Sequence, residues 1–94
     1  MEVWINDAEI IERINHCLAN LSDEKHAELA QNGIASKIMG IIHNGKPTHE
    51  AVIDFCQATQ TSYRYIILGE TPIYDIDGKN ELYKRLIEKS DYTL

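Results

Sequence analysis

The fold of this 94-residue chain is decided by one stretch, Gly33-Ile34-Ala35-Ser36-Lys37-Ile38-Met39-Gly40-Ile41-Ile42-His43-Asn44-Gly45-Lys46-Pro47. Its aliphatic residues recur at helical spacing, and the glycines near its two ends favour left-handed turns. Pro47 prevents the helix from continuing. We therefore predict a helix over residues 36–43 that follows a tight turn at Gly33 and closes at Asn44-Gly45.

Apolar stripes and capping residues predict five further helices around this segment. Asn6 and Glu9 have the spacing of a capping box, and Ser22 precedes the next helical pattern. The expected helices span residues 7–20 and 23–32, a segment capped by Thr48, a segment from Ser62 to Gly69, and a segment from Lys79 or Asn80 to Ser90. The sequence is thus typical of an all-α protein.

Length and charge narrow the class of function. The chain is about the size of one compact domain, so we expect no separate catalytic domain. The formal net charge is −6, which opposes binding to a polyanion. However, no acidic residue occurs between Glu28 and Glu50, whereas this segment contains Lys37, His43, Lys46 and His49. One weakly positive surface is therefore expected in the middle of an acidic protein.

Several functions lack any supporting pattern. The four histidines are scattered without metal-ligand spacing, and no nucleophile motif or phosphate loop is present, so we expect neither an enzyme nor a cofactor nor a metal. Cys17 and Cys56 lie singly in apolar patterns and are expected to be buried and reduced. No membrane span or signal-peptide pattern is present, so we expect a cytoplasmic protein and no membrane partner.

Two short helices around a glycine turn, the second without exposed acids, are the pattern of a helix-turn-helix. The second helix enters the major groove of DNA and must turn small, polar or basic side chains outward. We expect Met39 and Ile42 to face the core with Ile34. Ile38 and Ile41 cannot all be buried with Met39 and Ile42 on a single stripe, so one or two of these residues should be partly exposed. The candidate DNA-binding residues are Ser36, Lys37, Gly40, His43, Asn44 and Lys46.

A family resemblance supports this interpretation. The run from Gly33 to Pro47 resembles the Gly-Val-Ser…Ile-Ser…Gly-Lys…Pro core of phage CI and Cro-like repressor domains. Residues 50–59, with Ser62 and the following Tyr65-Ile66-Ile67-Leu68-Gly69-Glu70, resemble the end of that domain. The resemblance implies a compact five-helix, lambda-repressor-like domain that binds operator DNA as a dimer, with Ser36, Lys37 and Gly40 contacting bases. The chain departs from the family at Gln60 and Thr61, where a glycine and an aliphatic residue are common.

The remaining residues suggest a domain division and a dimerisation element. We expect a DNA-binding domain over residues 1–72, and a connector with an amphipathic helix over residues 73–94. The apolar stripe of that helix, a candidate dimerisation surface, comprises Leu82, Tyr83, Leu86 and Ile87. Packing of this helix on the domain is the alternative. The main hypothesis is a phage-type repressor that binds operator DNA as a homodimer. The competing one is a small antirepressor or accessory protein that binds another repressor or a polymerase component.

Overall fold

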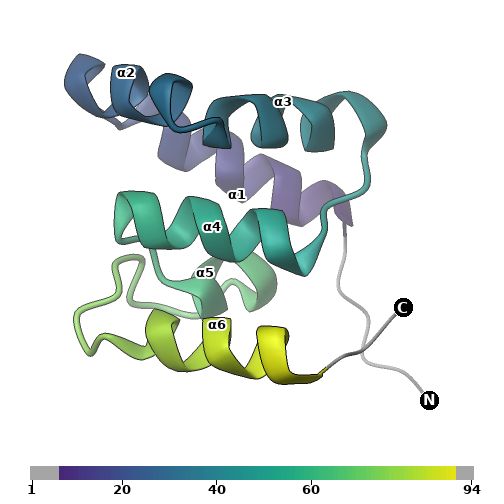
Figure 1. Cartoon of the computed structure of the whole chain (residues 1–94), viewed down its shortest axis with the longest axis vertical. Coiled ribbons are helices and arrows are strands. Elements are labelled where there is room, and N and C mark those ends of the chain that lie inside the picture. Colours follow the sequence, from purple (N-terminus) through teal and green to yellow (C-terminus); the bar gives the residue numbers. More distant parts are fainter. Residues whose placement is uncertain (1–6, 91–94) are drawn as a thin grey trace.

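The computed structural model describes residues 7–90, which form six α-helices (Figure 1). Their bounds are α1 Asp7–Ala19, α2 Asp23–Gln31, α3 Ile34–Asn44, α4 His49–Thr59, α5 Tyr63–Leu68 and α6 Lys79–Ser90. These residues include no β-strand, only an isolated antiparallel bridge between Thr61 and Tyr74. The expected all-α class is therefore confirmed.

The helices are stacked along the long axis of the molecule, with α2 and α3 at one end and α6 at the other (Figure 1). Between these ends, α4 contacts α3, α5 and α6, and α1 packs against α5. Within residues 7–90, no helix combines the length and the apolar character that a membrane span requires. Because α3 and α6 lie at opposite ends of the stack, each has an outer side that faces away from the core (Figure 1).

The core is formed mainly by α1 and α4. In α1, Ile10, Ile14 and Cys17 are buried at helical spacing, as the apolar stripe predicts. The α4 helix buries six of its eleven residues, namely Ala51, Val52, Ile53, Phe55, Cys56 and Thr59. Both cysteines are thus buried, as expected. Leu29, Ile38, Ile41, Ile66 and Ile67 close the core from the other helices.

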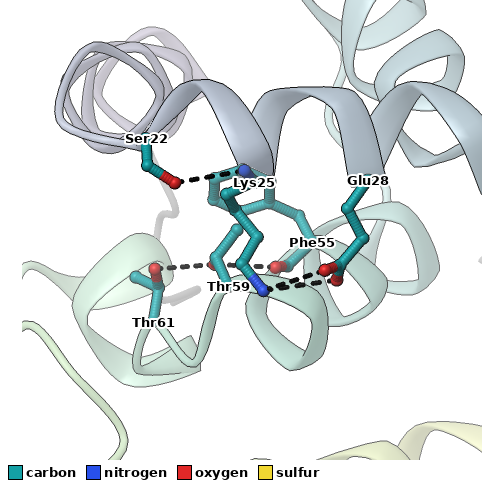
Figure 2. Close-up of polar contacts among 6 residues, drawn as sticks. All are labelled: Ser22, Lys25, Glu28, Phe55, Thr59 and Thr61. Atoms are coloured by element: carbon teal, nitrogen blue, oxygen red, sulfur yellow. Dashed lines mark hydrogen bonds and ion pairs between the residues drawn. The ribbon is translucent and has the colours of Figure 1, made fainter.

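Side-chain caps begin the helices where the sequence places them. The Ser22 hydroxyl accepts a hydrogen bond from the Lys25 amide at 3.1 Å, as Figure 2 shows. At the starts of α4 and α5, the hydroxyls of Thr48 and Ser62 likewise accept a hydrogen bond from the amide three residues further on. Each cap satisfies an amide that has no partner within its helix. Asn6, the predicted cap of α1, lies outside the described residues.

The buried side of α3 differs from the prediction. Ile38 and Ile41 are only 1% and 5% exposed, whereas Met39 is 50% exposed, so the expectation that Met39 faces the core is wrong. Ile34 and Ile42 are partly buried. The helix begins at Ile34 rather than at Ser36, and its inner stripe follows Ile34, Ile38 and Ile41 at steps of four and three. The sequence of α3 allows either of two overlapping apolar stripes to be buried. In the packed structure, the stripe that contains Ile38 and Ile41 faces the core.

A left-handed turn joins α4 to α5 at Gln60. The φ angle of Gln60 is 61°, a conformation that a Cβ penalises by about 1 kcal/mol or more. The segment is held on both sides, because the Thr59 hydroxyl donates to the Phe55 carbonyl and pairs with the Thr61 hydroxyl at 2.8 Å (Figure 2). The backbone here thus takes a conformation that glycine favours, although the residue is a glutamine.

The connector between α5 and α6 is tied to the same turn. The Ser62 amide donates to the Ile73 carbonyl at 2.7 Å, and the Asp75 amide donates to the Gln60 carbonyl at 2.8 Å. The carboxylate of Asp75 then accepts from the amides of Lys79 and Asn80 and so caps α6. These bonds fix the position at which α6 begins.

A buried amide completes this attachment. Asn80 is 1% exposed; its side chain accepts from the Tyr63 amide at 2.9 Å and donates to the Thr61 carbonyl at 2.7 Å. Because buried polar groups are costly when unpaired, this side chain stabilises the junction of α4, α5 and α6. With α6 also packed on α4, the C-terminal helix contributes to the fold of the described chain.

Replacement of Asn80 by alanine is expected to lower the free energy of unfolding by about 3 kcal/mol, because it leaves the Tyr63 amide and the Thr61 carbonyl without partners. Urea denaturation followed by circular dichroism measures the change. Asp77→Ala, an exposed substitution in the connector, is the control and should change stability by about 0.5 kcal/mol or less. Equal, small losses in both variants would contradict the role given to Asn80.

Candidate nucleic-acid interface

The two helices of the candidate interface are joined by a two-residue turn. Asn32 closes α2, Gly33 has a φ of 82°, and α3 begins at the next residue. The Asn32 side chain accepts a hydrogen bond from the Ile34 amide at 3.1 Å and so satisfies the start of α3. The usual helix-turn-helix turn has about three or four residues. The α2–α3 connection is therefore tighter than the motif usually has.

The structure places the six predicted DNA-binding residues on α3 or directly after it. Ser36, Lys37, His43, Asn44 and Lys46 are exposed, and Gly40 is partly exposed. Ser36, Gly40 and His43 are spaced by four and three residues and hence lie along one side of the helix, which we call the outer row. A Cβ added at Gly40 would meet no atom within 4 Å. The backbone of α3 is therefore accessible at the middle of the outer row.

Lys37 forms an ion pair within the chain. Its Nζ lies 2.9 Å from Oδ2 of Asp54 on α4. The pKa of Lys37 is raised because its ammonium donates a hydrogen bond to Asp54 and is attracted by the charge of that carboxylate, with a smaller contribution from Glu50. Lys37 thus stays charged at neutral pH, but its charge is balanced locally. The sequence placed Lys37 correctly on the surface and gave no sign of its partner, which is seventeen residues away.

Met39 is a residue of this surface that the sequence analysis assigned to the core. It is spaced by three residues from Ser36 and by four from His43, so it borders the outer row. Its half-exposed side chain adds an apolar contact to an otherwise small and polar surface. The sequence allows either of two overlapping apolar stripes on α3 to be buried. It does not show which one is, so the exposure of Met39 could not be predicted.

The charge around the outer row is mixed. Lys46 is exposed and has no ion-pair partner among the described residues. On the other side of the turn, α2 carries the acids Asp23, Glu24 and Glu28, of which Glu28 pairs with Lys25 at 3.2 Å (Figure 2). The region from Ser36 to Lys46 is thus weakly positive beside an acidic neighbour.

Across the described residues, no group of three or more His, Cys, Asp or Glu side chains is arranged to hold a metal ion. Comparison with protein-family models, with curated proteins and with solved structures finds no match to this chain. The resemblance to phage repressor domains therefore stays a prediction from the residues that carry it.

The open space at Gly40 predicts an unusual stability change. Gly40→Ala is expected to raise the free energy of unfolding by about 1 kcal/mol, because alanine is the better helix former and nothing obstructs its Cβ. Thermal denaturation measures this gain. In contrast, Gly33→Ala should lose about 1 kcal/mol or more, since Gly33 has a positive φ. If Gly40→Ala lowered the free energy of unfolding as much as Gly33→Ala, the conclusion that the backbone is accessible at Gly40 would be wrong.

Proposed function

We propose that the chain is a transcription regulator of the phage-repressor type that binds duplex DNA through the outer row of α3. The observation that carries this proposal is the accessible outer row itself, which follows directly on the Gly33 turn. No acidic residue of the sequence lies between Glu28 and Glu50, so α3 presents no negative charge of its own to phosphates.

The chemistry of this surface suits contact with the major groove, which is about 12 Å wide and admits one helix. The Ser36 hydroxyl is suited to a phosphate or a base edge, and the absence of a side chain at Gly40 permits close approach of the backbone. Met39 offers an apolar contact for a thymine methyl group. Lys46 and His43, near the end of α3, are the residues proposed to contact phosphates.

For the fold we propose a lambda-repressor-like arrangement of α1–α5, to which α6 is added. Two turns support it: Gln60 takes the left-handed conformation before α5, and Gly69 takes it after α5, where the sequence resembles the Gly-Glu ending of the family. In such domains operator half-sites are bound by two copies, and we extend that homodimeric binding to this chain as part of the proposal.

A second candidate function, recognition of a protein instead of DNA, is favoured by two observations. The ion pair with Asp54 balances the charge of Lys37, and Met39 is half-exposed beside a glycine. A partly apolar helix surface with small side chains and little net charge is also suited to another protein. An antirepressor or accessory protein of this kind would form a stable complex with a repressor or a polymerase component.

Few phosphate contacts are expected, and the salt dependence of binding measures them. With Lys46 as the unpaired cation of this surface and Lys37 balanced by Asp54, log K against log salt should have a slope of about −1 per chain, since each contact contributes about −0.9. Binding is measured by fluorescence anisotropy on random duplex and on duplex from around the gene. Lys46→Ala should reduce the slope by about 1 on both DNAs, whereas Lys84→Ala on α6 should leave it unchanged. No binding at low salt would reject the DNA proposal in favour of the protein one.

The Lys37–Asp54 pair predicts a variant with stronger DNA binding. Asp54→Asn removes the carboxylate that balances Lys37, so binding at low salt should tighten by roughly three- to tenfold and the slope should steepen by about 1. Asp77→Asn makes the same change of net charge in the connector and should have little effect. Adding Lys37→Ala to Asp54→Asn should abolish the gain. If both aspartate variants bind equally more tightly, only net charge matters and the pair has no specific role.

A further inference from the structure

The α6 helix has a second apolar side that its own fold leaves uncovered. Tyr83 and Ile87 pack against the core, whereas Leu82 and Leu86, one turn apart, are each 53% exposed. The stripe expected from the sequence is thus divided between the two sides. We call Leu82 and Leu86 the leucine ridge. It lies on the helix at the end of the molecule opposite α3 (Figure 1).

The charged residues that are spaced by three positions from a leucine of the ridge are all basic. At three residues from Leu82 or Leu86 stand Lys79, Arg85 and Lys89, which are neighbours on the helix surface. All three are exposed. Lys79 borders a hollow that Asp75 and Asp77 also line, and Arg85 lies 3.4 Å from Glu81. Lys89 has no ion-pair partner among residues 7–90. The leucine ridge is therefore bordered by cations.

The acids of α6 lie on its other flank, toward α4. Glu81 accepts a hydrogen bond from the Gln57 side chain at 3.2 Å. Glu88 lines a hollow between α4 and α6 together with Glu50 and Asp54. Neither Glu81 nor Glu88 is spaced by three or four residues from a leucine of the ridge. A partner that covers the ridge would therefore meet mainly positive charge.

This charge pattern argues against a second copy of the chain as the occupant. In an antiparallel α6 pair centred on the leucines, Lys79 of one copy would lie opposite Lys89 of the other at both ends. In a parallel pair, each cation would face its own counterpart. Like charges at such positions destabilise a helix pair. A complementary helix carries leucines between acidic residues instead.

We propose that the leucine ridge of α6 binds an acidic amphipathic helix of a partner protein. The leucines supply the apolar contact of a helix laid along a groove or ridge, and Lys79, Arg85 and Lys89 select the charge of the partner. The site lies on the opposite end of the molecule from the outer row of α3, so this proposal does not depend on DNA binding.

The test uses the whole 94-residue chain labelled with ¹⁵N, together with a synthetic helical peptide that has leucines at steps of three and four between glutamates. Addition of the peptide is expected to shift amide resonances of α6 and to saturate. A second peptide with lysine in place of every glutamate is the control for charge and should bind at least about tenfold more weakly. Equal binding of the two peptides, no binding of the acidic one, or shifts confined to other helices would overturn the proposal.

Two pairs of variants separate the ridge from nonspecific attraction. Leu82→Ser with Leu86→Ser should weaken binding of the acidic peptide at least about tenfold, whereas Leu68→Ser removes a similarly exposed side chain at the end of α5 and should not. Lys89→Gln should weaken it several-fold, in contrast to Lys25→Gln on α2. Sedimentation of the unmodified chain completes the test: a dimer that the two serine substitutions dissociate would make a second copy the occupant and the proposal wrong.

Discussion

The burial of α4 is the constraint on which the rest of the structure depends. More than half of this helix is inaccessible to solvent, including Phe55 at its centre, and a helix that is apolar on most sides must be covered from several directions. The α3, α5 and α6 helices provide that cover. Because Ile38 and Ile41 are required on the inner side of α3, Ser36, Gly40 and His43 are left outside. The candidate interface is thus the reverse side of a core contact.

Helix number and most helix starts could be predicted from the sequence because their causes are local, although α3 begins at Ile34 rather than at Ser36. Ser22, Thr48 and Ser62 act within one turn of their own helices, and Gly33, Gly45 and Gly69 end or separate helices through their own backbone angles. The exposure of the five candidate residues with polar or basic side chains was predictable for the same reason. On a short amphipathic helix whose apolar side is buried, the polar side chains face solvent.

What the sequence could not supply depends on contacts between helices. The five large apolar residues at positions 34, 38, 39, 41 and 42 allow two inner stripes, and only the packing of α3 against its neighbouring helices decides that Met39 is outside. The pairing of Lys37 with Asp54 has the same origin, because no local spacing links residues seventeen apart. The division of the α6 stripe likewise follows from where Asn80 anchors that helix.

The two buried cysteines have a consequence for measurement. Cys17 and Cys56 come from the two helices that form most of the core, and burial raises the pKa of both thiols. A thiol reagent needs an accessible thiolate, and Cys56 is 0% exposed, so the reagent reacts at Cys56 only when the core opens. The rate of alkylation therefore reports how often the folded chain opens. The native thiol is thus a probe for opening of the folded state, and no label has to be introduced.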